Sequence, residues 1–269
     1  YGDILNKNRL LKKIKTSKPQ IFFHLAAQSL VIESYNDPKM TFETNVIGTA
    51  NILGACKHQK NLRSLIIVTS DKCYLNLGQN KSFKEDSPLG GNDPYSCSKA
   101  MVERLVRLYL HRIYNKKSIG LATVRAGNVI GGGDFSKNRI IPDIVKHILN
   151  KKKLVLRNPT SHRPWQHVFD VLLGYLNLGI KLSKDKNKFS GSYNFGPKVK
   201  KDYTVLKLTQ KFLDKLIKKK YKIKFSKGKL FESNCLDINS NKSRTKLKWK
   251  TKYSGFEMIE KTIDWYKFF

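Results

Sequence analysis

The sequence predicts an α/β protein in which a parallel sheet is followed by a smaller, mixed α/β region. Two observations support this prediction. In the first half of the chain, short apolar runs typical of strands buried on both faces alternate with longer segments of helical periodicity. Polar or glycine-rich loops follow these runs. Because consecutive strand–helix–strand units form parallel sheets with right-handed crossovers, we expect the first half to form one such sheet.

The elements of the first half are defined by their apolar positions. Strands are expected over residues 21–26, 65–69 and 119–124, which read IFFHLA, LIIVT and IGLATV. Between them, apolar residues at helical spacing predict helices over 40–56 and 95–114. The inward face of the second helix is expected to consist of Val102, Leu105, Val106 and Tyr109.

The second half is less regular and is expected to form a substrate-binding region. Its periodicity predicts four helices and two short strands. The helices are expected over 140–150, 170–182, 203–219 and 254–267, and the strands over 153–157 and 166–169. We therefore divide the chain into residues 1–130, which carry the sheet, and residues 131–269, with part of 153–195 expected to return to the sheet.

The charge of the chain raises the question of a nucleic-acid partner. The 269 residues include 53 Lys and Arg against 20 Asp and Glu, which gives a formal net charge of +33. However, 43 of the 53 basic residues are Lys, whereas base and phosphate recognition favours Arg. We therefore expect no nucleic-acid partner, and we expect the positive field to attract an anionic substrate such as a nucleotide.

The cysteines and the hydropathy pattern restrict the setting of the protein. Cys56, Cys73, Cys97 and Cys235 are scattered without CxxC spacing. This spacing predicts neither a metal cluster nor a disulfide framework, and it fits a reducing cytoplasm. No apolar run reaches 18 residues and no signal-peptide pattern is present, so we expect neither a membrane span nor secretion.

Polar or small residues follow all three expected strands at their carboxyl ends, where parallel sheets bind ligands. The first strand leads into AAQS (26–29), whose small residues would let a cofactor approach the backbone closely. The second strand leads into SDK (70–72), and the third into AGN (126–128) and then GGGD (131–134). The agreement among three strand ends predicts a ligand site at this edge of the sheet.

Tyr95 and Lys99 lie four residues apart at the start of an expected helix, so they share one face of it. In a chain this rich in Lys the spacing also arises by chance, and the alternative is a buried Tyr beside a solvated Lys. A phenol with a pKa of about 10 is a weak base at neutral pH. The Lys99 ammonium and a positively charged nicotinamide would lower that pKa. With the Ser70 hydroxyl bound to the reacting hydroxyl group, these residues predict a hydride-transfer site.

Six segments resemble the extended short-chain dehydrogenases/reductases. They are HLAAQS (24–29), NVIGT (45–49), TSDKCY (69–74), DPYSCSK (93–99), VRAGNVIGGGD (124–134) and RNPTSHRPWQHV (157–168). The resemblance extends from Gly2 to the C-terminus. Within this family the sequence most resembles the CDP-glucose 4,6-dehydratase branch, because most other 4,6-dehydratases have Asp-Glu where this chain has Asp71 and Lys72. It implies a Rossmann-like sheet, NAD as cofactor, a homodimer or higher homo-oligomer, and a role in making deoxysugars for a bacterial surface polysaccharide.

The resemblance also implies a reaction on CDP-glucose. Tyr95 would take the proton of the sugar 4-hydroxyl while hydride leaves C4; water would then leave across C5–C6, and the hydride would return to C6. Asp71 occupies the family's acid position and would protonate the departing 6-hydroxyl. Lys72 occupies the position of the base, for which it must be neutral, and Lys99 together with the oxidised cofactor would lower its pKa. The alternative for Lys72 is a solvated charge.

The binding residues come from the same resemblance. The cofactor is expected to contact Asp3, Ile4, Leu25, Ala26, Ala27, Asn45, Thr69, Tyr95 and Lys99. The substrate is expected to contact Gln28, Asn128, Arg139, Arg157, Arg163 and His167. Arg163 is the expected diphosphate clamp, since a planar guanidinium can bind phosphate through two parallel hydrogen bonds. Trp165 either stacks on the nucleobase or belongs to the core, and no metal is expected.

One part of the family pattern has no counterpart in this sequence. The family begins with a strand and a GxxGxxG phosphate-binding turn, upstream of the position that Gly2 and Asp3 occupy here. The run at 131–133 cannot replace that turn, because it follows a different strand and precedes no phosphate-facing helix start. We therefore expect the sequence to be a fragment of a longer protein, with the catalytic residues present and the cofactor grip incomplete.

Two other functions remain open from the sequence. A sugar-nucleotide 4-epimerase, or a dehydratase of GDP-mannose or dTDP-glucose, would use the same hydride transfer. An epimerase needs no acid at position 71, so Asp71→Asn separates it from a dehydratase. The second possibility is a non-catalytic polybasic protein on the same scaffold, which would bind nucleic acid or anionic surfaces in a salt-sensitive way.

Overall fold

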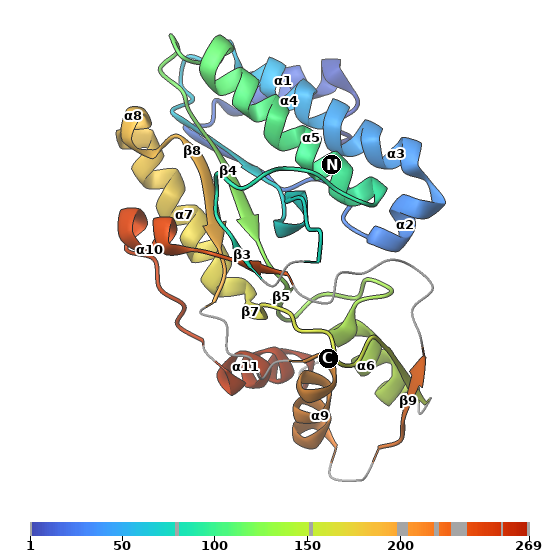
Figure 1. Cartoon of the computed structure of the whole chain (residues 1–269). Coiled ribbons are helices and arrows are strands. Elements are labelled where there is room, and N and C mark those ends of the chain that lie inside the picture. Colours follow the sequence, from blue (N-terminus) through green and yellow to red (C-terminus); the bar gives the residue numbers. More distant parts are fainter. Residues whose placement is uncertain are drawn as a thin grey trace.

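A four-stranded parallel sheet forms the centre of the fold, as the sequence predicts (Figure 1). The computed structural model describes residues 2–78, 81–150, 153–197, 204–217, 221–226, 236–253 and 255–267. The strand order is β1-β2-β4-β8. These strands are β1 (Ile21–His24), β2 (Ser64–Val68), β4 (Gly120–Ala126) and β8 (Gly191–Phe195).

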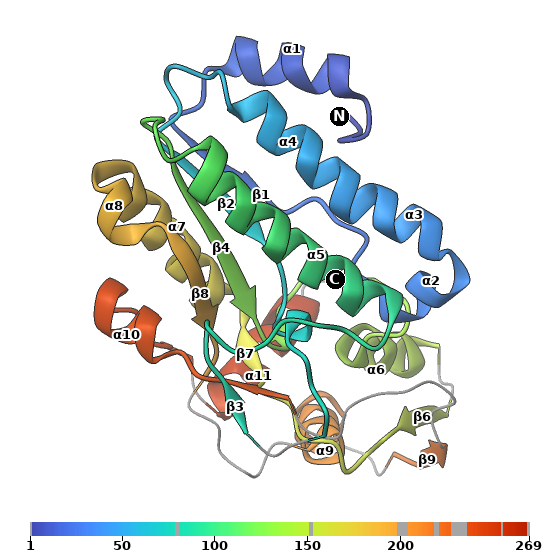
Figure 2. The same cartoon turned by 45° about the horizontal axis from the view of Figure 1, so that its top comes forward.

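One face of the sheet is covered by the helices that connect its strands. Figure 2 shows a continuous helical run beside α5, and both pack with β2 and β4. The run consists of α3 (Pro38–Phe42), a π-helical turn η1 (Glu43–Ile47) and α4 (Gly48–Cys56), and α5 (Pro94–Leu108) continues into a second π-helical turn η3 (Tyr109–Ile113). The helices expected over 40–56 and 95–114 are therefore confirmed. Helix α1 (Lys7–Ser17) packs on α4.

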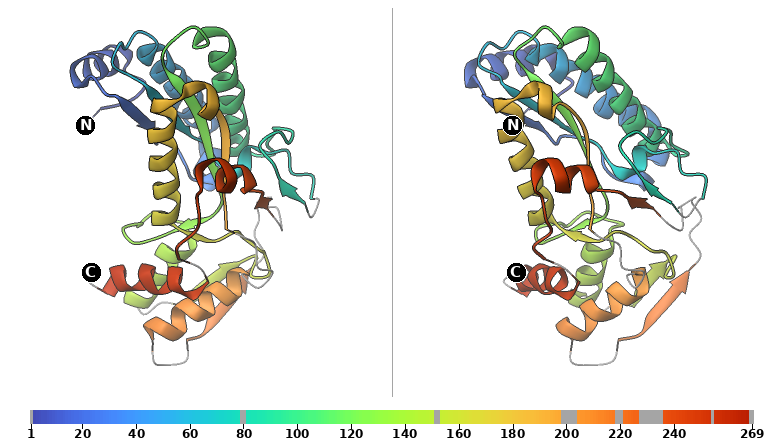
Figure 3. Two further views of the ribbon diagram at one scale, coloured as in Figure 1. Left: turned by 90° about the vertical axis from the view of Figure 1, so that its left-hand side faces the viewer. Right: turned by 60° about the vertical axis from the view of Figure 1, so that its left-hand side comes forward.

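The opposite face is covered by α7 (Val168–Lys184), so the sheet lies between two helical layers (Figure 3). Leu65 and Ile67 of β2 pack with α4 and α5, whereas Ile66 between them packs with α7. This is the alternation that a strand imposes on its side chains. The outer side of α7 exposes large apolar residues at helical spacing, and they are Phe169, Leu173, Leu176 and Ile180.

A second, smaller group of elements has its own apolar core. It combines α6 (Ile140–Leu149), β6 (Leu154–Arg157), α9 (Val205–Leu216), β9 (Ile223–Ser226) and α11 (Phe256–Lys267). The remaining described elements of the chain are short. They are α2 (Val31–Asn36), η2 (Asp71–Cys73), β3 (Ser82–Phe83), β5 (Val129–Ile130), β7 (Gln166–His167), α8 (Lys186–Phe189), β10 (Asp237–Ile238) and α10 (Asn241–Leu247).

Some boundaries differ from the sequence-based expectation. The strand expected over 166–169 ends at His167, because α7 begins at Val168 and the His167 Nδ1 accepts a hydrogen bond from the Phe169 amide at 3.3 Å. Helix α1 was not expected, since only Ile14 of its residues is buried and its apolar pattern is weak. The expected helix ends at 203, 218–219 and 254, and Cys235, lie outside the described residues.

The glycine run at 131–133 makes a close packing contact. A Cβ on Gly132 would lie 2.0 Å from the Trp265 ring of α11, so only glycine fits there. Gly133 has a φ of +79°, a conformation that side chains disfavour. The run thus joins the loop after β5 to α11, in agreement with the expectation that it is not a phosphate-binding turn.

Candidate active site

Tyr95 and Lys99 lie in the first turns of α5, whose start is fixed by local capping. The Asp93 carboxylate accepts a hydrogen bond from the Ser96 amide at 2.9 Å, and Pro94 occupies a first-turn position where its missing N–H costs nothing. Both catalytic candidates are buried, and the Lys99 Nζ lies 5.8 Å from the centroid of the Tyr95 ring. The shared face that the spacing predicts is therefore confirmed.

Ser70 brings the end of β2 to Tyr95. The Ser70 side chain lies close enough to Tyr95 for hydrogen bonding to lower the pKa of the phenol, and the Ser70 hydroxyl donates to Asp71 Oδ1 at 2.8 Å. Ser70 caps the short 3₁₀ helix η2 by accepting from the Lys72 amide at 3.2 Å. A hydroxyl, a phenol and a carboxyl group therefore meet at the carboxyl end of β2.

The buried position of Asp71 suits a general acid. Its side chain is only 4% exposed, and Oδ2 has no hydrogen-bond partner among the described residues. Burial raises the pKa of this carboxyl group, against the opposing effects of Lys72, Ser70 and Arg163. Burial thus shifts this carboxyl group toward its protonated form, which is the direction that a proton donor requires.

Tyr95 corrects one expectation. Burial raises its pKa to about 12, and the hydrogen bond with Ser70 only partly opposes this effect. The chain's own positive charges therefore do not lower this pKa, because loss of hydration outweighs them. The lowered pKa expected with the nicotinamide bound stays a prediction. Burial also lowers the pKa of Lys99 to about 8, while the Glu103 carboxylate raises it. The Lys99 ammonium donates to the Val68 carbonyl oxygen at 3.4 Å.

The loop after β1 is held against α5 by Asn45. The Asn45 amide accepts from the Gln28 backbone N–H at 2.9 Å and donates to the Gln28 carbonyl oxygen at 3.0 Å and to the Ser98 hydroxyl at 2.9 Å. The Gln28 side chain donates to the Leu30 carbonyl oxygen and to Thr41, so its amide is engaged within the loop. A contact between the Gln28 side chain and the substrate would have to replace these bonds, and this expected contact stays a prediction.

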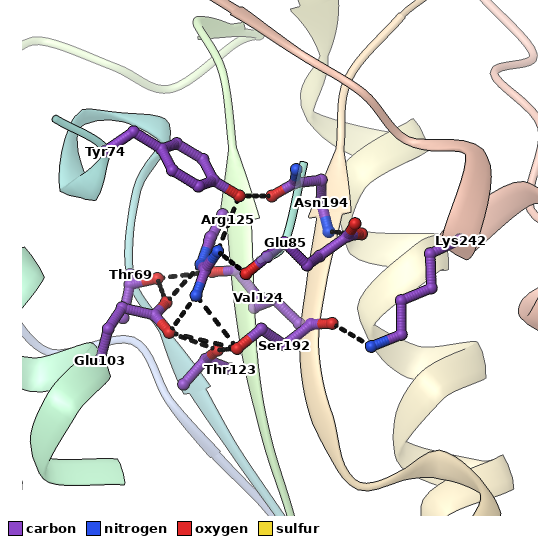
Figure 4. Close-up of polar contacts among 10 residues, drawn as sticks. All are labelled: Thr69, Tyr74, Glu85, Glu103, Thr123, Val124, Arg125, Ser192, Asn194 and Lys242. Atoms are coloured by element: carbon purple, nitrogen blue, oxygen red, sulfur yellow. Dashed lines mark hydrogen bonds and ion pairs between the residues drawn. The ribbon is translucent and has the colours of Figure 1, made fainter. Parts of the chain in front are cut away.

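The other expected cofactor residues lie in different settings. Leu25 and Ala26 are exposed at the carboxyl end of β1, and Ala27 is half-buried. Asp3 is exposed and accepts from the Leu5 amide, while Ile4 packs beside α4. The Thr69 hydroxyl instead donates to Glu103 at 2.5 Å in the interior (Figure 4), so its side chain is engaged away from any cofactor.

Two of the expected substrate residues carry charge to the cluster. Arg163 is half-buried and close enough to lower the pKa of Asp71. Arg139 acts in the same direction on Tyr95, and its guanidinium donates to Asp134 and, at 2.9 Å, to the Ser29 hydroxyl. The structure therefore brings both guanidinium groups to the residues expected to be catalytic.

Among the described residues, no hydrogen bond or ion pair joins the remaining expected substrate residues to this cluster. Asn128 accepts from the Gln166 amide through its backbone, and Arg157 is exposed on β6. His167 is buried against the rings of Phe169 and Tyr253, each with a centroid 5.0 Å away. Their roles stay predictions. Trp165 is buried in the core around α6 and α11, which favours the second of its two readings.

The sequence reasoning missed a buried polar network directly behind the site. It is formed by Glu103, Arg125, Tyr74, Thr123, Ser192 and Asn194 (Figure 4). Two signals could have revealed it. Glu103 lies four residues after Lys99 on the same helix, and Arg125 interrupts an otherwise apolar strand. A cavity of about 820 Å³ borders this network but not Ser70, Asp71, Tyr95 or Lys99, so we do not assign it to the substrate.

Comparisons with known proteins agree with this geometry. The sequence model of the GDP-mannose 4,6 dehydratase family matches residues 1–262. The CDP-glucose 4,6-dehydratase of Salmonella typhimurium is 36% identical over 99% of this chain and 76% of its own length. The CDP-paratose 2-epimerase of Salmonella typhi is 25% identical over 98% of this chain and 83% of its own.

Solved structures share the fold. The dTDP-glucose 4,6-dehydratase of Bacillus anthracis, determined in complex with NAD, is 28% identical and has a TM-score of 0.80, covering 99% of this chain and 78% of that one. A dTDP-glucose 4,6-dehydratase from Streptomyces venezuelae has a TM-score of 0.85 at 23% identity, with the same coverage. The Rossmann-like prediction is thereby confirmed. With a family match over nearly its whole length and a dehydratase so similar in sequence, this chain belongs to the GDP-mannose 4,6-dehydratase family.

Proposed function

We propose that the protein is a hydro-lyase that converts CDP-glucose to CDP-4-keto-6-deoxyglucose, with NAD as a recycled hydride carrier. The observation that carries this proposal is Asp71, a buried carboxyl group with a free oxygen, one contact from the Ser70–Tyr95 pair. Hydride transfer alone needs no such acid. Elimination of the 6-hydroxyl does, because hydroxide is a poor leaving group until it is protonated.

In the oxidation step, Tyr95 takes the proton of the sugar 4-hydroxyl while Ser70 holds that hydroxyl. The two side chains lie close enough for Ser70 to affect the pKa of Tyr95, so a sugar oxygen placed beside them would meet both. Lys99 supplies positive charge next to the phenol, and its ring-centroid distance of 5.8 Å suits a charge effect rather than a direct bond. The positive charge offsets the burial that otherwise keeps Tyr95 protonated.

In the elimination step, the ketone at C4 makes the C5 proton acidic, and that proton is removed while Asp71 protonates the leaving 6-hydroxyl. Lys72 follows Asp71 directly on η2 and is half-buried, which supports it as the base. Water leaves and a C5–C6 double bond forms. Return of hydride to C6 and of a proton to C5 gives the 4-keto-6-deoxy product.

The chain offers a fitting surface for a nicotinamide cofactor, which when bound would accept the hydride and return it. Leu25 is 53% exposed and Ala26 is also exposed at the carboxyl end of β1, beside the strand that leads to Ser70. Small and apolar residues at that position allow a flat ring to approach the backbone. The NAD complex of the Bacillus anthracis relative supports the same cofactor here.

The charges around the site suit a nucleoside diphosphate. Arg163 and Arg139 present guanidinium groups near Asp71 and Tyr95, where the diphosphate of a bound nucleotide sugar would need partners. CDP is the favoured nucleotide because the relative with 36% identity is a CDP-glucose 4,6-dehydratase.

The test is an assay of the natural full-length protein with CDP-glucose, UDP-glucose, dTDP-glucose and GDP-mannose, each supplied with NAD. We expect a product lighter than its substrate by one water, and only from CDP-glucose, as measured by mass spectrometry. If another nucleotide sugar is dehydrated instead, that compound replaces CDP-glucose as the proposed substrate. If none of the four is dehydrated, the enzyme proposal fails.

We also propose that the protein is a homodimer in the cytoplasm. Neighbouring helices expose large apolar residues at seven-residue spacing, Met40 and Ile47 on α3 and η1, and Met101 and Leu108 on α5. An exposed apolar surface formed by two adjacent helices suits an isologous contact with a second copy.

The cysteines support the cytoplasm as the compartment. Cys56 and Cys73 are buried free thiols, which fits a reducing environment.

A further inference from the structure

A buried ion pair lies directly behind the candidate site. The Arg125 guanidinium of β4 donates to Glu103 of α5 through Nε at 2.8 Å and Nη2 at 2.6 Å, and both side chains are 2% exposed (Figure 4). Burial of two charges is costly, and such pairs often contribute little to stability compared with an apolar replacement. Its position therefore calls for a role other than core stability.

One end of this pair reaches the residue before Ser70. The Glu103 carboxylate accepts the Thr69 hydroxyl at 2.5 Å. Glu103 also lies four and eight residues after Lys99 and Tyr95 on α5, so the three side chains share one helix face. The carboxylate raises the pKa of Lys99 against the effect of burial.

The other end reaches the residue after η2. Arg125 Nη1 donates to the Tyr74 hydroxyl at 2.7 Å and to the Glu85 carbonyl oxygen at 3.0 Å. Tyr74 in turn donates to Asn194 Oδ1 of β8 at 2.7 Å. The six-residue segment 69–74, which carries Ser70 and Asp71, is thus tied to one ion pair at both of its ends.

We propose that Glu103 and Arg125 are positioning residues that hold the segment 69–74 so that Ser70 and Asp71 face Tyr95. This inference rests on the proposed function for its catalytic consequence, but not for its structural one. Reacting groups in enzymes lose rate steeply with displacement, and an error of about 1 Å can cost roughly 100-fold. A clamp at both ends of a short segment limits such displacement.

The first test removes one tie at a time with near-isosteric changes. Thr69→Val deletes the hydroxyl that joins the segment to Glu103, and its matched control Thr123→Val deletes another hydroxyl bound to Glu103 at 2.8 Å, from β4. Tyr74→Phe deletes the tie at the far end. Its control, Tyr114→Phe, removes an equally buried hydroxyl that donates to the Leu53 carbonyl oxygen, away from the segment.

The primary readout needs no activity. Hydrogen exchange by mass spectrometry reports the Cys73 and Tyr74 amides, which donate to the Ser70 and Asp71 carbonyl oxygens within the segment. We expect Thr69→Val and Tyr74→Phe to raise exchange in peptides covering 69–75 by at least about tenfold, and neither control to do so. Equal exchange in test and control variants would overturn the proposal, whether or not the protein turns over CDP-glucose.

The second readout is kinetic. We expect kcat to fall between roughly tenfold and 100-fold in Thr69→Val and Tyr74→Phe while KM stays near the wild-type value, because the clamp orders catalytic rather than binding groups. The controls should keep the wild-type kcat. If exchange rises in the test variants but kcat does not change, the clamp exists without a positioning role. If the wild-type protein itself gives no product, the proposed function fails and the exchange result stands by itself.

Glu103→Gln tests the charge. Loss of the carboxylate leaves Arg125 buried without its counter-charge, so this variant is expected to be less stable, and the Thr69 and Tyr74 variants remain decisive if it does not fold. In folded Glu103→Gln, the alkaline limb of the kcat profile should move to lower pH, since Lys99 loses a neighbour that raises its pKa. A purely structural role would leave that limb in place.

Discussion

Asp71 and Tyr95 are joined through Ser70, and burial raises the pKa of both side chains. The chemical effect on each is opposite. A raised pKa shifts Asp71 toward the form that can donate a proton, whereas it holds Tyr95 as the phenol, which cannot accept one. Burial therefore favours the acid of the site, and the base depends on positive charge beside the phenol, from Lys99 and from the bound cofactor.

Asp71→Asn removes the acid while it keeps the size of the side chain. We expect dehydration of CDP-glucose to fall by roughly 100- to 10,000-fold, the range that general acid catalysis usually contributes. Product formation by mass spectrometry gives the measurement. A protein that is an epimerase would keep its activity in this variant, and that result would contradict the dehydratase assignment.

The Lys99 ammonium gives a pH prediction. Burial lowers its pKa to about 8, so the charge beside Tyr95 is present below that pH and is lost as the pH rises through it. We expect kcat to decline between pH 8 and 10, measured at saturating substrate, as Lys99 loses its proton. In Lys99→Arg the guanidinium stays charged, so the decline should shift to higher pH. An unchanged decline would assign it to a group other than Lys99.

At this scale the sequence predicts the directly reacting groups and misses those behind them. Ser70 and Tyr95 could be paired because strand ends and helix spacing place them at one edge of the sheet. Glu103 and Arg125 stand out in the sequence only as a charge on the Lys99 face and a charge within a strand. Their bonds to each other and to Tyr74 are decided by the fold, which brings α5, β4 and the loop after η2 together. The sign of the Tyr95 pKa shift likewise depends on burial, which a motif does not reveal.

Helix α5 carries catalytic candidates on one side and part of the proposed dimer surface on the other. Its buried side carries Tyr95, Lys99 and Glu103, and its outer side exposes Met101 and Leu108. Its prediction from sequence succeeds because one amphipathic pattern runs through it. Strand β8 alternates, with Tyr193 and Phe195 in the core beside α7 and with Ser192 and Asn194 in the buried polar network. An alternation with polar residues is typical of a strand that has one face in water, so it does not reveal that both faces of β8 are covered.

The outer side of α5 gives a prediction about assembly. Leu108→Glu places a charge in the apolar surface that we assign to the dimer, so we expect the variant to run as a monomer in light scattering after gel filtration. Leu149→Glu on α6 is the matched control, since that leucine is also exposed, at 75%, and lies on a different helix. Dissociation in both variants, or in neither, would argue against this interface.

The net charge of +33 is far more than the candidate site uses to bind an anionic substrate. With 43 Lys among 53 basic residues, the charge is spread along the chain rather than gathered as guanidinium groups for base recognition. Its physical effect is a long-range field that attracts anions and that salt screens. The net charge is predictable from composition alone, whereas its effect on substrate binding is not.

We expect kcat/KM for CDP-glucose to fall several-fold between about 0.05 and 0.5 M NaCl, with kcat nearly constant, because screening weakens the capture of a dianionic substrate. Steady-state kinetics across this range give the measurement, with a neutral osmolyte as control. A salt-independent kcat/KM would remove any role for the field in substrate capture. Tight, salt-sensitive binding of nucleic acid without turnover would favour the polybasic binding protein instead.

The edge of β1 has a practical consequence for anyone who handles this polypeptide by itself. Among the described residues β1 pairs only with β2, and the inner side of α7 packs on β1 where Gly179 meets Phe23, while the outer side of α7 exposes its apolar residues. A strand with one unpaired side next to exposed Phe and Leu side chains is a template for aggregation. Mutual repulsion at +33 opposes that association in dilute buffer. Salts that screen this charge should therefore promote association, and crystallisation trials would best begin at low ionic strength.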